Sequence, residues 1–526
     1  MWNESFTKID EISRRTLLIG ALASSATLML PPSLAAAEGG DVAASAKAAR
    51  DAVEAVREAI LRISREVWQN PELSLHEEKS SEIHLRELKE AGFKIVSTGT
   101  SGIPTAFVAE WTQGEGGPKI GFLPEYDALP NLGNAAEPRQ APGPTGIEVG
   151  HGCGHNMLGA GCTGAAFALQ KMMIDGKVPG TIMVYGCAAE ETEGAKVYMA
   201  RDGLFNDLDA CLAWHPGPMN ATGLLRTAAV NMLRIRYTGR TAHAGVDPWE
   251  GRSALKGAEM FGIGIQFMRE HIKPTTRLHY VYTDGGSAPN VVPASAEILI
   301  VIRDQDRDDV NTVTEWVKDA ARGAATSTQT EVDIDHFFGL HDLLPNETLV
   351  NRIHAHMTKL PLEWTAQEQE FAKACQREMQ LPEAGLMPVI MPVLPEITTG
   401  GGTDVGDVSF NTPTGLFAIA TMPIGVGLHT WPVTACGGMS IGDKGSIYSA
   451  IVMAGVGYDL MTDAKLRAAA RADFDRRKAG RKYVSPLVET RLRPDGIPQH
   501  LLLRDGSQEL GVEFVEEAID SKTPTP

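Results

Sequence analysis

The strongest constraint on the fold is an alternation of apolar, strand-like segments with helix-like segments in the first half of the chain. The strand-like segments are KIGFLP (119–124), TIMVYGCAA (181–189) and DACLAW (209–214). Helix-like stretches precede or separate them at 51–68, 156–173 and 196–201, the first with apolar residues every three or four positions. Strands that alternate with helices form parallel sheets, because each helix returns the chain to the start of the next strand. We therefore expect an α/β domain.

The pattern changes near residue 223. Apolar periodicity there predicts strands at 226–237, 277–283, 296–303 and 329–336, with helices at 252–270 and 308–322. The order β-α-β-β-α-β is that of a ferredoxin-like unit. We expect this unit to be a second domain, residues 223–336, inserted into a first domain made of residues 48–222 and 337–460.

The two ends of the chain differ in composition from the rest. Paired Arg14 and Arg15 stand directly before an apolar run of 14 residues, which is shorter than the roughly 20 residues of a membrane-spanning helix. The run leads into PPSLAAAE, which contains an A-x-A cleavage site. Residues 1–37 therefore resemble a twin-arginine export signal and predict a periplasmic protein. Residues 461–526 are rich in charged side chains, and we expect them to form a C-terminal tail.

Charge and composition limit the partners of the protein. The 526 residues carry a formal net charge of −18, and 43% of them are hydrophobic. Such a chain can bury a sizeable core, but it has no basic surface that would neutralise phosphates. Six cysteines are too few for a disulfide scaffold in a chain of this length. We expect a small-molecule or peptide substrate, no nucleic acid and no membrane span.

The hexapeptide HGCGHN (151–156) is a dense group of potential metal ligands. Cys153 and His155 are two residues apart, so in an extended loop both side chains leave on the same side. Glu190 and Glu191 follow one predicted strand, and His215 follows the next. Open α/β folds gather their sites beyond the carboxyl ends of such strands. Because adjacent residues of an extended segment point to opposite faces, one of the two glutamates can bind metal while the other faces substrate.

Eight segments resemble, in the same order, the binuclear metallopeptidases that include aminoacylases, hippurate hydrolases and indole-acetyl-amino-acid hydrolases. These segments are GFLPEYDALP (121–130), GHGCGHNMLGAG (150–161), GCAAEETEGAK (186–196), WHPG (214–217), GRTAHAG (239–245), GGSAPNVVP (285–293), TDVGDVS (403–409) and GLHTW (427–431). Within the family, the p-aminobenzoyl-glutamate hydrolase type is the most similar. The resemblance covers residues 48–460 and implies a metallopeptidase-type α/β catalytic domain with an inserted lid and dimerisation domain.

The resemblance also implies a set of site residues and two divalent metal ions in each chain. The implied metal ligands are Cys153, His155, Glu191, His215 and His429. Glu190 is the implied general base, and Asp127 is the implied neighbour of the metal centre. A thiolate ligand favours zinc on chemical grounds, while the resemblance also allows manganese or cobalt. One departure is Asn156, because most relatives have aspartate at this position.

Three further implied residues, His243, Asn290 and Arg303, lie in the inserted domain. In the family this domain forms a homodimer, and its histidine reaches the active site of the partner chain. The resemblance thus gives His243 a role in catalysis and in substrate binding. It assigns Asn290 and Arg303 to the substrate carboxylate, which suits the fork of a guanidinium group. Whether a second, different type of chain is also required stays open.

The expected activity is metal-dependent hydrolysis of an amide bond in an N-acyl amino acid, with a p-aminobenzoyl-glutamate-like substrate favoured. One alternative is a periplasmic dipeptidase or a general, hippurate-like N-acyl-amino-acid hydrolase. A second alternative is a non-catalytic protein that binds metal or amino acids. The presence of Glu190 beside Glu191 argues against the second alternative, since a binding site needs no general base.

Overall fold

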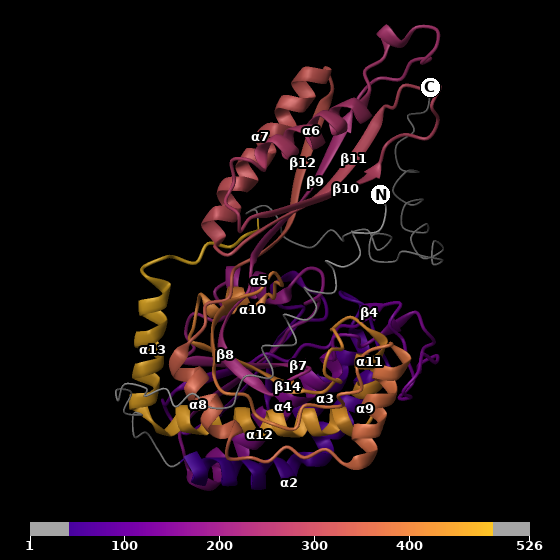
Figure 1. Cartoon of the computed structure of the whole chain (residues 1–526). Coiled ribbons are helices and arrows are strands. Elements are labelled where there is room, and N and C mark those ends of the chain that lie inside the picture. Colours follow the sequence, from indigo (N-terminus) through magenta and orange to yellow (C-terminus); the bar gives the residue numbers. More distant parts are fainter. Residues whose placement is uncertain (1–41, 488–526) are drawn as a thin grey trace, which may run out of the picture. The chain divides into compact units, whose positions relative to one another are not determined.

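The computed structural model describes residues 42–487 of the chain (Figure 1). The expected export signal, residues 1–37, lies outside the described residues, as does the end of the expected tail, residues 488–526. No helix within residues 42–487 has the length and apolarity needed to cross a membrane.

An eight-stranded sheet forms the centre of the first domain, in the order β1-β2-β6-β3-β7-β14-β8-β13. The four neighbouring strands β6, β3, β7 and β14 are parallel, which confirms the expected α/β fold, whereas β1, β2 and β8 introduce antiparallel pairs. The bounds are β1 Lys94–Thr98, β2 Phe107–Gln113, β3 Lys119–Phe122, β6 Gly180–Gly186, β7 Ala210–Gly217, β8 Ala221–Arg226, β13 Leu394–Thr398 and β14 Thr414–Ala420.

Three long helices, α2 (Val42–Gln69), α4 (His155–Gly176) and α12 (Ser440–Thr462), pack against one another beside this sheet (Figure 1). Helix α4 is buried along most of its length and is rich in glycine and alanine. These small residues allow close approach. A Cβ on Gly161 would lie 2.7 Å from Nε1 of Trp214 on β7 and would also collide with Ser449 on α12. The sequence of α4 therefore fixes how closely it approaches its neighbours.

Shorter elements complete the first domain. They are α3 Glu78–Glu90, β4 Leu129–Pro130, β5 Val149–Gly150, α5 Ala195–Arg201, α8 Glu347–Met357, α9 Ala366–Glu378, α10 Val405–Ser409, α11 Trp431–Gly437 and α13 Ala464–Lys478. Helix α9 is polar, and Thr365 and Glu368 form a capping box at its start. Helix α13 lies within the segment predicted to be a charged tail, and Asp463 caps it.

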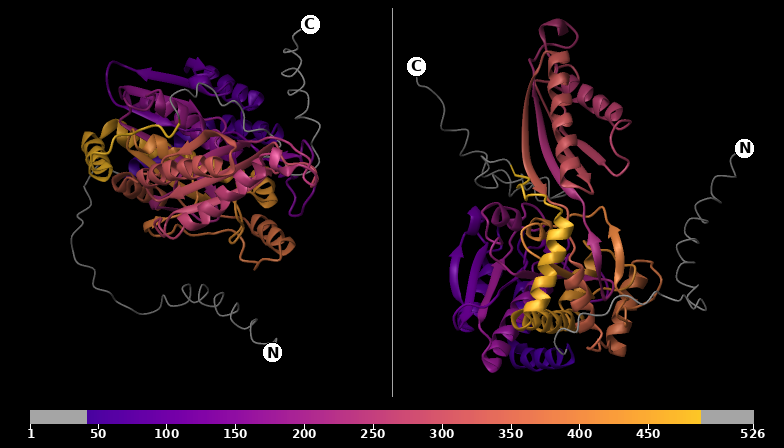
Figure 2. Two further views of the ribbon diagram at one scale, coloured as in Figure 1. Left: turned by 90° about the horizontal axis from the view of Figure 1, so that it is seen from above. Right: turned by 90° about the vertical axis from the view of Figure 1, so that its left-hand side faces the viewer.

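A second sheet, in the order β10-β11-β9-β12, is antiparallel and has its own hydrophobic core. Its elements follow the expected β-α-β-β-α-β order. They are β9 Ala229–Thr238, α6 Ala254–Met268, β10 Arg277–Asp284, β11 Ser295–Asp304, α7 Arg307–Thr328 and β12 Glu331–Leu340. Both helices lie on one face of this sheet (Figure 2). That the unit acts as a lid or dimerises stays a prediction.

Candidate metal centre

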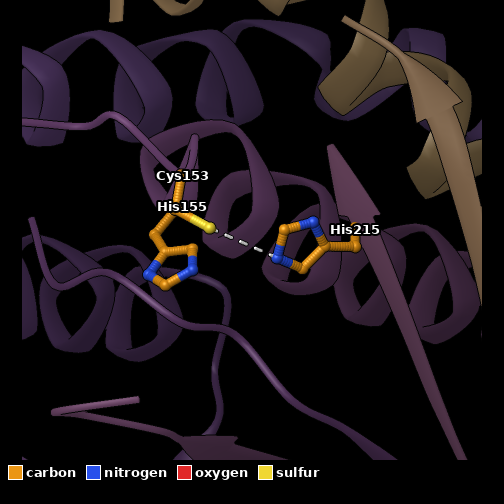
Figure 3. Close-up of side chains that lie close together, drawn as sticks. All are labelled: Cys153, His155 and His215. Atoms are coloured by element: carbon orange, nitrogen blue, oxygen red, sulfur yellow. Dashed lines mark hydrogen bonds between the residues drawn. The ribbon is translucent and has the colours of Figure 1, made fainter. Parts of the chain in front are cut away.

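Strand ends and one glycine-rich loop bring the predicted ligands together. Cys153 and His155 come from the loop and first residue of α4, and His215 lies on β7 (Figure 3). The Sγ atom of Cys153 is 3.5 Å from Nε2 of His215. Glu190 and Glu191 lie just beyond β6, next to β7 and β3 at the same edge of the parallel strands. This is the position that the strand and helix alternation predicts.

Backbone conformations that few residues adopt shape the loops of the site. Gly154 has φ of 81° directly before α4, and a Cβ there would lie 2.6 Å from Met157 and 2.9 Å from Pro216. His429 has φ of 61°, which is uncommon for a residue with a side chain. Its N–H donates to the carbonyl of Gly152 at 2.9 Å. This bond brings His429, more than 270 positions further along the sequence, onto the cysteine loop.

The donor atoms form three groups that share members. The groups are Cys153, His155 and His215; Cys153, Glu191 and His429; and Glu125, His155 and Glu190. Within each group the donor atoms lie within 4.8 Å of one another. The structure thus gathers all five residues predicted as ligands, together with Glu190, into one centre. It adds Glu125, which our sequence reasoning missed even though it stands two residues before Asp127 in EYDALP.

Three buried donor atoms of this centre form no well-aligned hydrogen bond among residues 42–487. They are Oε2 of Glu125, Nε2 of His155 and Oε1 of Glu191, although Oε2 of Glu125 lies 3.3 Å from Nε2 of His155 and Oε1 of Glu191 lies 3.2 Å from Nε2 of His429. Leaving a buried polar atom without a partner is costly, on the order of 1–3 kcal/mol each. Burial and the carboxylates of Glu125 and Glu191 also raise the pKa of Glu190 well above its ordinary value. Convergent unpaired donors and crowded carboxylates are what a divalent cation would satisfy, so the residues fit a metal centre.

His155 and His215 are each oriented by a hydrogen bond to the ring nitrogen that faces away from the centre. Nδ1 of His155 is 2.8 Å from Oδ1 of Asp127, which leaves Nε2 directed at the other donors. Nδ1 of His215 is 2.7 Å from the carbonyl oxygen of Pro216, which has the same effect. Metal-binding histidines in proteins are held in this way. Asp127 therefore lies where the sequence predicted, beside the donor groups.

Two buried carboxyl groups fix the backbone on either side of Glu190. The N–H of Ala189 donates to Glu77 at 2.7 Å, and the N–H of Glu191 donates to Asp127 at 2.9 Å. Ala189 has φ of 54°, a conformation that side chains disfavour, so this turn needs such support. Burial and the carboxylate of Asp127 raise the pKa of Glu77 to about 8. Nothing in the sequence around Glu77 distinguished it from a surface glutamate.

A buried lysine links Glu125 to a distant segment. Nζ of Lys196 lies 2.7 Å from Oε1 of Glu125 and 2.6 Å from Oδ1 of Asp404. Burial lowers the pKa of Lys196, but Asp404 and Glu125 more than offset this and hold it well above its ordinary value. The charged lysine leaves the second oxygen of Glu125 free to face His155, 3.3 Å from Nε2. Lys196 and Asp404 stand in the quoted segments GCAAEETEGAK and TDVGDVS, but neither was predicted as a site residue.

The three predicted residues of the inserted domain do not join the donor groups of the described chain. His243 is exposed in a loop, where its Nδ1 accepts from the N–H of Gly245 at 3.1 Å. Asn290 is exposed in the facing loop, and its carbonyl accepts from the N–H of Ala244. Arg303 donates from Nη1 to the carbonyl of Gly400 at 2.9 Å. Within a single chain, these side chains are therefore apart from the metal centre.

Asn156 has a structural environment that explains why no carboxylate is needed there. Its Nδ2 atom lies 3.2 Å from Oγ of Ser64 on α2 and 3.2 Å from the carbonyl oxygen of Gly437 on α11. The amide thus ties the start of α4 to two other helices. An aspartate could not donate these bonds.

Comparison with known proteins agrees with this geometry. The sequence profile of peptidase family M20/M25/M40 matches residues 122–417. The chain belongs to this family. Its members include metal-dependent hydrolases of amide and peptide bonds, and this protein is one of them.

Two relatives are similar to this chain in sequence, and one solved structure is similar to it in fold. It is 35% identical over 444 residues to one of the subunits of p-aminobenzoyl-glutamate hydrolase from Escherichia coli, and the match covers 79% of this chain and 92% of that protein. It is 32% identical over 333 residues to the Xaa-Arg dipeptidase of Mus musculus, covering 61% and 73%. The aminobenzoyl-glutamate utilization protein from Klebsiella pneumoniae shares the fold, with a TM-score of 0.51 and 16% identity over 77% of this chain and 97% of that one.

Proposed function

We propose that this family member hydrolyses the amide bond of N-acyl amino acids, with p-aminobenzoyl-glutamate or a close analogue as the favoured substrate. The observation that carries the proposal is Glu190, whose carboxylate shares a group of donor atoms with His155 and Glu125. A proton acceptor beside a metal centre is what amide hydrolysis requires. The 35% identity to part of a p-aminobenzoyl-glutamate hydrolase, over most of both chains, supports the choice of substrate.

In the proposed mechanism, two divalent ions would be held by Cys153, His155, Glu191, His215 and His429. When bound, such ions polarise a carbonyl group and lower the pKa of water to about 7. Glu190 accepts a proton from the water that attacks the amide carbonyl, and it later delivers this proton to the nitrogen of the leaving amine. Asp127 keeps His155 in the required orientation through the bond to Nδ1. Asn290 and Arg303 bind the substrate carboxylate, and His243 of the neighbouring chain stabilises the developing negative charge.

Zinc is the proposed metal, because the site contains a thiolate and imidazole nitrogens. Manganese and cobalt are the alternatives. Elemental analysis of protein purified without added metal, followed by reloading of chelator-treated protein with each ion, decides between them. We expect two ions per chain and the highest activity with the native metal. A single ion per chain at full activity would contradict the two-ion proposal.

A dipeptidase is the second candidate function, favoured by the 32% identity to an Xaa-Arg dipeptidase. The deciding experiment incubates the metal-loaded protein with p-aminobenzoyl-glutamate, hippurate and dipeptides ending in arginine, and follows the products by mass spectrometry. We expect p-aminobenzoate and glutamate to form fastest. Faster release of arginine would favour the dipeptidase. Metal binding without cleavage of any of these would favour the non-catalytic alternative.

We further propose that the protein is a homodimer joined through the inserted domain. Helix α6 exposes Met260, Ile263 and Phe267, with 73% of Phe267 accessible, and β10 is an edge strand next to it. Apolar side chains beside an unpaired strand edge are suited to pairing with a second copy. Two relatives from Escherichia coli are named as different subunits of one hydrolase, so a chain of a second type is an alternative partner. Light scattering of the purified protein measures the mass.

The proposed location is the periplasm, reached by the twin-arginine route, on the strength of Arg14, Arg15 and the apolar run that follows. Cell fractionation of the wild type and of a variant with both arginines replaced by lysine tests this. We expect the wild type in the periplasmic fraction and the variant in the cytoplasm. Retention of both in the cytoplasm would contradict the proposal.

A further inference from the structure

An apolar cavity of about 240 Å³ begins at His215 and extends along β14 and β8. Its walls include Leu225, Leu416 and Phe417 of the sheet, together with Leu343 from the segment before α8 and Val350 from α8 itself. None of the residues that carry the proposed catalysis, apart from His215, borders it. The cavity is therefore next to the metal centre but is separate from the donor groups.

Strand register places Ala221, Leu416 and Ala418 of the cavity lining on the face of the sheet that carries His215, whereas Phe417 and Thr222, which pair with each other, point to the opposite face. Ala418 of β14 pairs with His215 of β7, and Leu416 pairs with Ala213. Ala221 of β8 pairs with Ala418. Because paired residues of neighbouring strands point to the same face, these cavity residues share the face of the His215 ring. Nε2 of that ring is 3.5 Å from Sγ of Cys153.

The polar residues that line the cavity use their polar atoms inside the protein. The hydroxyl of Thr222 donates to the carbonyl of Leu416, and that of Thr414 donates to the carbonyl of Thr412. The side chain of Asn346 accepts from the N–H of Leu349 and donates to the carbonyl of Ala470. The lining also contains no lysine, arginine, aspartate or glutamate. The cavity therefore offers almost no hydrogen bonds and no fixed charge to a ligand.

These properties select which part of a substrate can enter. The amino-acid side of an N-acyl amino acid carries a carboxylate, and burying it without a partner would be very unfavourable. The acyl side carries no charge. An apolar cavity of about 150 Å³ is sufficient to bind benzene. A cavity of about 240 Å³ thus has room for one substituted aromatic ring.

We propose that this cavity binds the aromatic acyl group of the substrate and so sets the preference for aroyl amino acids over small acyl groups. The inference rests on the proposed amide hydrolase function and adds a site to it. On this proposal, Leu416 and Leu225 help to determine which acyl group the enzyme accepts. The amino-acid carboxylate then remains outside the cavity.

The test compares two substrates that differ only in the acyl group, p-aminobenzoyl-glutamate and N-acetyl-glutamate. In Leu416→Trp the indole fills the cavity, so the ratio of kcat/KM for the aromatic over the acetyl substrate should fall at least tenfold. Adding or removing a single methylene in an apolar pocket already changes selectivity by roughly 10- to 200-fold. Val96→Trp is the matched control, because it places the same side chain at an exposed position of β1, at the opposite edge of the sheet. An unchanged ratio in Leu416→Trp would overturn the proposal.

A second variant and a binding measurement distinguish a filled cavity from misfolding of Leu416→Trp. Leu416→Ala enlarges the cavity and should raise the relative kcat/KM for a 2-naphthoyl substrate, whereas no gain would count against the proposal. Fluorine NMR of 4-fluorobenzamide, which carries no charge, should show binding to the wild type and at least tenfold weaker binding to Leu416→Trp, independently of turnover. Binding of equal strength to both would overturn the site. If the wild type binds the probe but cleaves no N-acyl amino acid, the proposed function fails while the cavity assignment stands.

Discussion

At the scale of single residues, the position of Glu190 depends on two carboxyl groups that do not themselves contribute donor atoms to a metal group. Glu77 and Asp127 accept the backbone N–H groups immediately before and after Glu190. Displacing a reacting group by about 1 Å can cost on the order of a hundredfold in rate. Loss of either hydrogen bond to the backbone beside Glu190 should therefore lower kcat.

Replacing Glu77 by alanine should lower kcat by about 10- to 100-fold, because the N–H of Ala189 loses its acceptor and Glu190 shifts. KM and metal content should stay close to those of the wild type. Glu77→Gln keeps an acceptor oxygen, and should retain most of the activity. Steady-state kinetics with elemental analysis measures both variants. Equal losses in the two variants would show that hydrogen bonding to Ala189 is not the reason.

Replacing Glu190 by glutamine should reduce kcat by roughly 10² to 10⁴, the usual contribution of a general acid–base group. The amide has nearly the same size but cannot accept a proton, so metal content should not change. Turnover and bound metal are measured on the same sample. Wild-type turnover in this variant would remove Glu190 from the mechanism.

At the scale of elements, helix α4 carries both the metal loop and the closest packing in the first domain. Gly161 leaves no space for a methyl group between Trp214 and Ser449. Gly161→Ala should destabilise the protein by about 1–3 kcal/mol through overpacking. Gly323→Ala is the matched control on α7, where the position is exposed and a Cβ would meet no atom within 4 Å. That control should stabilise the helix by about 0.5–1 kcal/mol. Urea unfolding measures both, and equal effects would contradict the packing argument.

The contact of α3 with α4 should make stability depend on pH. Burial lowers the pKa of His84 to about 3, and its Nδ1 lies 2.9 Å from the hydroxyl of Thr163. The unfolded chain binds a proton near pH 6.5, so the folded state loses stability as pH falls from 6.5 towards 3. Between pH 6.5 and 4.5, wild type should lose on the order of 2 kcal/mol more than His84→Gln. The exposed His76→Gln should behave like wild type. Urea titrations at several pH values provide the comparison.

The strands and helices were largely predictable from the sequence, and so was part of the site. Glu190 and Glu191 were found because they follow an apolar strand, and His215 because it stands near the end of the next strand along the chain, at the same edge of the sheet. Glu77 was not found, because its role is a bond to the backbone of residue 189, which leaves no trace in local sequence. Glu125 and Lys196 were missed for a similar reason. Their pairing with each other and with Asp404 depends on tertiary contacts between distant segments.

At the scale of the whole molecule, His243 should act on the metal centre of a partner chain, since within one chain it is exposed and apart from the donor groups. His243→Ala alone should lower kcat by about 10² to 10³ with metal retained. Mixing it with Glu190→Gln should restore activity, because each heterodimer then contains one site with both wild-type groups. Activity is measured before and after unfolding and refolding the mixture. No restoration, with heterodimers verified by mass spectrometry, would refute a shared site.

The sulfur of Cys153 belongs to two of the donor groups, whereas His215 and His429 belong to one each. Peroxide that carries this sulfur to the sulfinic state, which most cells cannot reverse, would disable both halves of the centre in one event. If the centre holds the two ions proposed above, the intact protein mass should rise by two oxygen atoms, and two metal ions should be released, for each Cys153 that is oxidised.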